Sequence, residues 1–471
     1  MKYWTWGSVL ILVLGWLGIT PMPVQADTFV VDSNADDANA HDTNPGDGLC
    51  SDVFNRCTLR AAIEETNAHT GADTITFQSE MYIYIDQSEG ALPSLTDYTT
   101  IDASNVWDSA NDRPGVTLHG GGASFNGLNI EQLYCQVYGL FIINFSSAIY
   151  LRSNTATIGG TGAGQRNVLS SNPDGCGVCM AGSSASANTV EGNYIGLSYS
   201  GDSKQPNYYG VYIAEGASAN KIRYNWISGN DYAGIYVLAN DALNNEITGN
   251  TIGLGADNLT PLGNGRYGVL VQLADHTSVK NNLIAANGWQ GVYLTEAVST
   301  TIQSNTIYGN SKQGVLLSNG SRDSFIYDNT IFANLEHGIQ IDGAGSFRNQ
   351  IDANSIYNNG GKGIALTNGG NNNLPAPTIL SASAFAASGT ATADTAYVQV
   401  YSDAADEGET YEAMCIVDHT SGHQWQCTGV FSGPNLTALA FDGHGNTSEF
   451  SRPCSTNGCY RVYLPSVLRQ H

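Results

Sequence analysis

Two columns of side chains recur around a repeated glycine and are spaced to contact one extended ligand. The residue two positions before each glycine is aromatic or charged: Tyr208, Tyr232, Arg266, Trp289, Lys312 and Glu336, with His337 beside the last. The residue two positions after it is aromatic or apolar: Tyr212, Tyr236, Leu270, Tyr293 and Leu316. Rings in a row suit the apolar faces of sugars, and polar groups orient the hydroxyls. We therefore expect a glycan-binding strip; the alternative is that Tyr and Trp simply favour a half-exposed sheet.

The charged members of the strip are also the candidates for catalysis. A polysaccharide lyase needs a base that removes a proton beside a uronate carboxylate, and a cation that neutralises that carboxylate. Arg266, Lys312, Glu336 and His337 are the residues that could supply these groups. A hydrolase needs two carboxyl groups about 5 to 9.5 Å apart. Glu336 and Asp342 lie on one repeat without matching carboxylates on its neighbours, so the sequence leaves catalysis open.

An internal repeat must position this strip. Most copies are 23 to 25 residues apart, and two longer steps contain insertions near 198–208 and 256–267. Inside each copy apolar residues alternate with period two, as in Val211-Tyr212-Ile213, which is typical of a strand with one buried face. Each copy also carries an anchor asparagine: Asn193, Asn225, Asn250, Asn282, Asn305, Asn329 and Asn354.

Short strands in repeats of this length predict one turn of a β-solenoid, in which each coil buries its inward face against its neighbours. Residues at the same phase then lie about 4.8 Å apart on successive coils, so each column becomes a row on the surface. An asparagine at a coil corner can bond both to the turn and to the asparagine of the next coil. We therefore expect a structural asparagine ladder.

The repeats resemble the right-handed parallel β-helix proteins of the pectin-lyase-like superfamily, over roughly residues 27 to 370. Asp47-Gly48-Leu49-Cys50, followed by Cys57-Thr58-Leu59-Arg60-Ala61-Ala62-Ile63-Glu64-Glu65, resembles the CSLREA module that precedes many secreted bacterial examples. Thr58 and Ala61 stand where that name has Ser and Glu. The resemblance implies an all-β, right-handed parallel β-helix. It implies no single activity, because the superfamily holds lyases, hydrolases, epimerases and adhesins.

The N-terminal region is expected to close one end of the solenoid. Residues 58–69 predict an amphipathic cap helix, with Arg60, Glu64 and Glu65 away from its apolar face. An oxygen-rich loop precedes it and is a weak calcium candidate, a solvated acidic loop being the alternative. Its residues are Asp36, Asp37, Asp42, Asn44 and Asp47.

The C-terminal region departs from the repeat. Leu374-Pro375-Ala376-Pro377 is typical of a linker, and the alternation that follows predicts a small Ig-like β-sandwich. The expected units are a signal peptide at 1–26, the N-terminal cap and first coils at 27–118, the β-helix at 119–373, the sandwich at 374–453 and a tail at 454–471. The tail is either a sorting segment or a plain final strand.

Close spacing of the cysteines predicts disulfides, as in proteins of oxidising compartments. The expected pairs are Cys50 with Cys57, Cys415 with Cys427, and Cys454 with Cys459. The sequence leaves open the state of Cys135, Cys176 and Cys179.

Charge and the N-terminal segment limit the partners. The 471 residues hold 18 Lys and Arg against 42 Asp and Glu, a net charge of −24, which opposes nucleic acid. Lys2, a short apolar run and Ala26 match a secretory signal, with no transmembrane anchor after cleavage. We expect a secreted or cell-surface bacterial protein that engages extracellular polysaccharide or cell-surface material. The alternatives are a polysaccharide lyase or other glycan-cleaving enzyme, and a non-catalytic adhesin or spacer.

Overall fold

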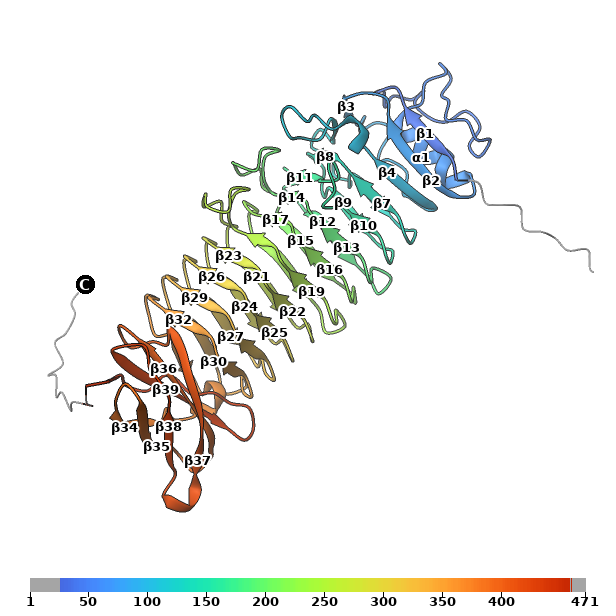
Figure 1. Ribbon diagram of the computed structural model, residues 1–471. Coiled ribbons are helices and arrows are strands. Elements are labelled where there is room, and N and C mark those ends of the chain that lie inside the picture. Colours follow the sequence, from blue (N-terminus) through green and yellow to red (C-terminus); the bar gives the residue numbers. More distant parts are fainter. Residues whose placement is uncertain (1–25, 458, 460–471) are drawn as a thin grey trace, which may run out of the picture.

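The computed structural model describes residues 26–457 and 459. It is an elongated right-handed β-helix with a β-rich unit at its C-terminal end (Figure 1). The expected signal peptide, apart from Ala26, and the expected tail beyond Cys459 lie outside the described residues. Within the described residues, no helix combines the length and apolar character needed to cross a membrane.

Three parallel sheets form the walls of the helix, and each coil contributes one strand to each wall. Sheet A holds β1 (Thr28–Val31), β2 (Ala72–Phe77), β4 (Tyr98–Asp102), β7 (Gln136–Tyr138), β10 (Thr157–Ile158), β13 (Thr189–Glu191), β16 (Lys221–Arg223), β19 (Glu246–Thr248), β22 (Ser278–Lys280), β25 (Thr301–Gln303), β28 (Phe325–Tyr327) and β31 (Gln350–Asp352). Sheet B holds β3 (Met81–Tyr84), β5 (Val116–His119), β8 (Leu140–Ile143), β11 (Val168–Ser170), β14 (Tyr194–Ile195), β17 (Trp226–Ile227), β20 (Thr251–Ile252), β23 (Leu283–Ala285), β26 (Thr306–Tyr308), β29 (Thr330–Phe332) and β32 (Ser355–Tyr357). Sheet C holds β6 (Leu128–Ile130), β9 (Ile149–Leu151), β12 (Cys176–Ala181), β15 (Tyr209–Ala214), β18 (Ala233–Leu238), β21 (Tyr267–Gln272), β24 (Val292–Thr295), β27 (Val315–Ser318), β30 (Ile339–Asp342) and β33 (Ile364–Thr367).

Alternation along each strand builds the core, because every second side chain points into the helix. In sheet C, Val211 pairs with Ile235 and Ile235 with Val269, and all three are fully buried. The predicted all-β, right-handed parallel β-helix is therefore confirmed.

Asparagine ladders run along the corners of the coils: two are long, and a third, between sheets C and A, consists of Asn188, Asn220 and Asn245. The first joins sheet A to sheet B and consists of the seven predicted anchors, preceded by Asn167; each Nδ2 donates to the Oδ1 of the next rung at 2.9–3.0 Å. The second joins sheet B to sheet C with the same spacing and was not predicted: Asn172, Asn207, Asn230, Asn264, Asn287, Asn310, Asn334 and Asn359. The predicted ladder is confirmed, and further asparagine ladders accompany it.

Helix α1 (Leu59–Ala68) closes the N-terminal end of the solenoid, as predicted. The Thr58 hydroxyl caps it by accepting a hydrogen bond from Ala61 N at 3.0 Å. Arg60 and Glu65 lie off the apolar face of the helix, as expected, but both are buried because the preceding loop covers them. Arg60 survives burial because its guanidinium donates to both carboxylate oxygens of Asp36 at 2.7 and 3.0 Å.

The C-terminal unit is one antiparallel sheet of seven strands that curls into a near-barrel. Its strands are β34 (Thr378–Ala382), β35 (Ala386–Thr390), β36 (Thr395–Asp403), β37 (Thr410–Asp418), β38 (Gln424–Thr428), β39 (Asn435–Asp442) and β40 (Cys454–Ser455). The 3-10 helix η3 (His419–Ser421) lies in this unit, whereas η1 (Ser104–Val106) and η2 (Gly370–Asn373) lie in the β-helix and directly after its last strand. Tyr401, Leu439 and Phe441 pack into the core of the β-helix itself, so this unit closes the C-terminal end of the solenoid.

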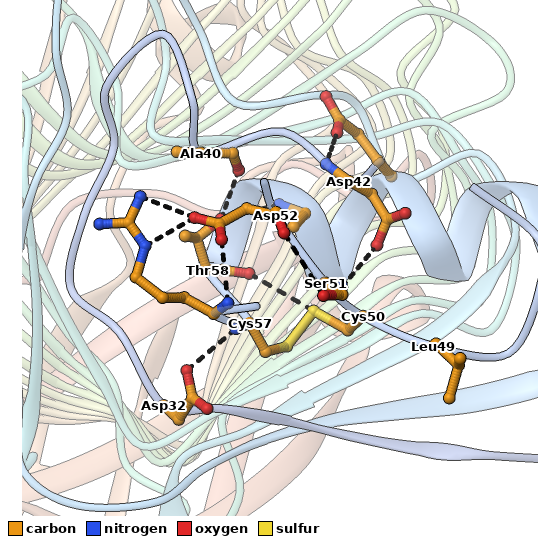
Figure 2. The surroundings of a disulfide bond; sticks show 12 residues. Asp32, Ala40, Asp42, Leu49, Cys50, Ser51, Asp52, Cys57 and Thr58 are labelled. Atoms are coloured by element: carbon orange, nitrogen blue, oxygen red, sulfur yellow. Dashed lines mark hydrogen bonds and ion pairs between the residues drawn. A yellow bond between two sulfur atoms is a disulfide. The ribbon is translucent and has the colours of Figure 1, made fainter. Parts of the chain in front are cut away.

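All three predicted disulfides are present: Cys50–Cys57, Cys415–Cys427 and Cys454–Cys459. The first lies beside the start of α1, where Cys57 N donates to Asp32 Oδ1 at 2.9 Å (Figure 2). Cys176 and Cys179 form a fourth disulfide within β12. Cys135 is a free thiol in the core, and burial raises its pKa to about 11. Four disulfides are typical of proteins that fold outside the cytoplasm.

The second ladder should contribute measurably to stability. In Asn287→Ala, the amide bonds to Asn264 and Asn310 are lost, and the buried backbone N–H of Asn264, which also donates to Asn287 Oδ1, loses its acceptor. We expect the free energy of unfolding to fall by about 1 to 3 kcal/mol, measured by urea unfolding. Asn240→Ala, in an exposed loop, is the control and should leave the midpoint unchanged. Equal midpoints for the two variants would contradict a stabilising ladder.

The junction between the β-helix and the C-terminal unit should be sensitive to pH. Burial raises the pKa of Glu407 from 4.5 to about 7, so ionisation is less favourable in the folded chain than in the unfolded one. The stability that protonated Glu407 contributes is fully present below about pH 4.5 and is lost as the pH rises to about 7. Glu407→Gln should therefore gain about 3 kcal/mol over the wild type at pH 8 and little at pH 4, measured by urea unfolding at both values. Glu409→Gln, on the exposed side of the same loop, is the control. A gain that does not change with pH would argue against this assignment.

Candidate functional site

The outer face of sheet C carries the predicted columns in register. Tyr212 pairs with Tyr236, Tyr236 with Leu270, Leu270 with Tyr293 and Tyr293 with Leu316, so one column runs straight along five coils. The repeat glycine allows this close stacking: a Cβ on Gly268 would lie 2.6 Å from Gly291 O. The predicted phase is thus confirmed in the backbone.

The column before the glycine forms a continuous series of rings and cations. Tyr208 stacks on Tyr232 with ring centroids 5.5 Å apart. The Arg266 guanidinium lies 4.7 Å from the Tyr232 centroid and 4.6 Å from that of Trp289. The Lys312 ammonium lies 4.2 Å from the Trp289 centroid. We call these five residues the strip; the structure brings together side chains that span more than 100 positions of the sequence.

A second layer of rings lies beneath the strip and was missed in the sequence. Tyr209 stacks on Tyr212 at 5.1 Å, and Tyr267 meets Trp289 edge to face at 5.4 Å. Both layer residues stand directly before the repeat glycine, a position that the column analysis skipped. They help to cover the inner column: Tyr236 and Leu270 are only 8% and 3% exposed. The expectation that this column faces solvent is wrong for these two residues.

Burial fixes the protonation of the inner tyrosines. It raises the pKa of Tyr209 and of Tyr267 to about 12 each, and it raises the pKa of Tyr236 as well, with neighbouring phenols adding to each shift. These phenols keep their protons at neutral pH. Tyr236 donates its proton to Gln272 Oε1 at 2.6 Å. These three residues contribute stacked rings to the face, and Tyr236 also contributes a hydrogen-bond donor.

A polar hollow of about 400 Å³ continues the face beyond the strip. A row of glutamines forms its floor: Gln290 donates to Gln313 at 2.9 Å and Gln313 to Gln340 at 2.5 Å. The residues that line the hollow are Gln290, Tyr293, Lys312, Gln313, Leu316, Ser318, Asn319, Glu336, Gln340 and Asp342. Lys312 therefore belongs both to the strip and to the hollow.

Two carboxylates and one cation share this hollow. Asp342 Oδ1 accepts hydrogen bonds from Thr367 Oγ1 at 2.6 Å and Asn368 Nδ2 at 2.7 Å, while Glu336 is exposed. The candidate His337 does not line the hollow, and its Nδ1 accepts a hydrogen bond from Lys362 N at 2.9 Å. Lys312, Glu336 and Asp342 are thus the charged groups placed for acid or base chemistry on this face.

The calcium candidates lie at the far N-terminal end and bond within the chain. Asp36 accepts hydrogen bonds from Arg60, and Asp42 accepts one from Asn44 N at 2.8 Å. Asp42 also accepts one from Ser51 N at 2.9 Å (Figure 2). Asp37 Oδ1 accepts from Asn39 N at 2.8 Å, and Asp47 Oδ1 from Leu49 N at 2.9 Å. Among residues 26–457 and 459, no group of three or more His, Cys, Asp or Glu is arranged to hold a metal ion.

Comparison with known proteins agrees on the β-helix. Residues 253–399 match the family described as a right handed beta helix region. No curated protein matches the chain.

Several solved structures are similar to the chain. One is the periplasmic alginate epimerase AlgG, at 15% identity and a TM-score of 0.41, with 63% of this chain and 65% of that chain covered. The chain thus spans just under two thirds of that epimerase. A second is the A-module of the Azotobacter vinelandii mannuronan C-5 epimerase AlgE4, at 17% identity and a TM-score of 0.40, with 65% and 92% covered. A third is a tailspike protein variant of E. coli bacteriophage HK620 in complex with a pentasaccharide, at 12% identity and a TM-score of 0.39, with 78% and 74% covered. At these identities no activity passes from these proteins to this chain.

Proposed function

We propose that the chain binds extracellular polysaccharide along the outer face of sheet C. The observation that carries the proposal is the unbroken series Tyr208, Tyr232, Arg266, Trp289 and Lys312, in which each member contacts the next. Aromatic rings bind the apolar faces of sugars, and cations beside them bind hydroxyl or carboxylate groups. A linear glycan offers such groups at regular intervals, and the strip is linear.

The dimensions of the strip suit a chain of sugars better than a single sugar. Its five members lie on successive coils, and four steps of about 4.8 Å give a length of about 19 Å. The hollow extends the same face by another coil, since it is lined by Glu336 and Gln340. Rigid stacking means that the site exists before the ligand arrives, which lowers the entropy lost on binding.

The charge on the strip favours a polysaccharide with anionic groups over a neutral one. Several other cations of the chain form ion pairs, such as Arg223 with Glu191 and Lys362 with Glu449. Arg266 and Lys312 instead contact ring faces, in a chain of net charge −24. Their charge is therefore available to a ligand.

The proposed setting is the bacterial cell surface or the surrounding medium. The signal-like N-terminus supports export, and four disulfides support an oxidising compartment. A polysaccharide partner belongs to that setting, whereas the acidic charge opposes nucleic acid.

Removal of the central ring should weaken binding. Trp289→Ala takes away the surface that both Arg266 and Lys312 contact, and we expect affinity for the best ligand of a glycan array to fall by about tenfold or more. Tyr224→Ala removes an exposed ring from the corner between sheets A and B and should leave affinity unchanged. Equal loss in both variants would contradict the placement of the site. Absence of any glycan binding by the wild type would favour the adhesin or spacer alternative.

A second candidate function is glycan cleavage, with a lyase as the first expectation. The observation that favours it is the hollow, where Lys312 lies on the same lining as Glu336 and Asp342. Lys312 could neutralise a uronate carboxylate, and a carboxylate could take or give a proton at the sugar ring. The raised pKa values of Tyr209, Tyr236 and Tyr267 make these tyrosines poor bases. Lys312, Glu336 and Asp342 are therefore the preferred candidates.

Turnover would separate an enzyme from a binding protein. If the chain is a lyase, incubation with polyuronates should release unsaturated products that absorb in the ultraviolet, and Lys312→Ala or Arg266→Ala should abolish the release. Lys280→Ala, on sheet A, is the control and should retain full turnover. Binding on the array without products from any polyuronate, or reducing ends without ultraviolet absorption, would rule out the lyase.

A further inference from the structure

The hairpin that joins β37 to β38 brings two histidines together. It reads Asp418-His419-Thr420-Ser421-Gly422-His423, and it lies in the C-terminal unit, away from the strip. The two Nδ1 atoms are 3.0 Å apart, and the rings meet at 66° with centroids 5.3 Å apart. The Nδ1 atoms of the two imidazoles are therefore close enough to bind the same ion.

The hairpin holds this arrangement through contacts that do not involve the imidazoles. Asp418 Oδ1 accepts from Thr420 N at 2.8 Å and from Thr420 Oγ1 at 2.6 Å, and Asp418 Oδ2 accepts from Ser421 Oγ at 2.7 Å. The carbonyl of His423 accepts from Ala391 N at 2.9 Å. His423 itself has a φ of 60°, a left-handed backbone conformation at the end of the turn. The pair is thus preorganised by the backbone of the turn.

The spacing fits chelation of a transition-metal ion. Imidazole nitrogens bind zinc at about 2.0 to 2.1 Å, so two nitrogens that share one ion lie about 2.9 to 3.4 Å apart for bond angles between square-planar and tetrahedral. Imidazole pairs suit zinc, copper and nickel, whereas calcium and magnesium require oxygen ligands. Without an ion, the two Nδ1 atoms share one hydrogen bond at 3.0 Å, and a rotation of the rings at the same Nδ1 separation turns both lone pairs toward a common ion.

We propose that His419 and His423 bind one divalent transition-metal ion, of the zinc, copper or nickel class, through their Nδ1 atoms. His419 is exposed and His423 half-buried, so water completes the coordination shell from the solvent side. The site is independent of the glycan-binding proposal, because the pair lies on the hairpin of the near-barrel and not on sheet C.

Calorimetric titration of the full chain with zinc chloride tests the proposal. We expect saturable binding of one ion, with affinity reduced at least tenfold in His419→Ala and in His423→Ala. His444→Ala, an exposed histidine on another loop of the same unit, is the matched control and should bind as the wild type does. Thermal midpoints recorded with a chelator present show that each variant is folded.

A spectroscopic readout distinguishes chelation from adventitious binding. Cobalt(II) added to the wild type should show visible absorption that saturates at one equivalent and disappears in both histidine variants. Zinc or cobalt binding that survives in His419→Ala and His423→Ala, or that is lost equally in His444→Ala, shows an adventitious ion only and overturns the proposal.

Discussion

In-register stacking of the coils is the constraint on which the rest of the structure depends. A slip of one residue would turn every inward side chain outward. The asparagine ladders oppose such a slip, because each amide meets its neighbour only in one register. Buried amides without partners are costly, so the ladders penalise each misplaced coil. The register that buries Val211, Ile235 and Val269 therefore also aligns the outward columns. The alignment of the proposed ligand face therefore follows from the packing of the core.

A stacked helix has two open ends, and this chain closes both with buried polar groups. At the N-terminal end, α1 buries the Arg60–Asp36 pair, whose hydrogen bonds satisfy the two charges. At the other end, Glu407 Oε2 accepts from Asn359 Nδ2 at 3.2 Å and so continues the second ladder into the C-terminal unit. Ile356 and Gly408 exchange two backbone hydrogen bonds at 2.9 Å. The C-terminal unit therefore acts as a cap and not as a tethered module.

The sequence predicted what repeats and missed what depends on distant contacts. Its period gave the solenoid, the first ladder and the phase of the strip, because periodicity is written locally in each copy. The second ladder was equally periodic, with Asn230 and Asn264 four residues before the repeat glycines, but insertions blurred its spacing. The burial of Arg60 could not be predicted, since its partner Asp36 lies 24 residues away. The composition of residues 374–377 predicted a linker and gave no sign that the C-terminal unit caps the β-helix. The residues that make the capping contacts, such as Tyr401 and Phe441, lie much further along the chain.

Sheet B packs its aromatic rings differently from sheet C. On sheet B, insertion loops bury Tyr194. Trp226 Nε1 donates a hydrogen bond to Asn258 Oδ1 of such a loop at 3.0 Å. Further along that sheet, Tyr308, Phe332 and Tyr357 stack at 4.9 and 5.0 Å and within 8° of parallel, so each ring covers its neighbour's face. On sheet C, Arg266 lies between Tyr232 and Trp289, Lys312 lies on Trp289, and the strip adjoins a hollow. Rings stacked face to face stabilise a wall, whereas rings separated by unpaired cations leave both charge and apolar surface for a partner.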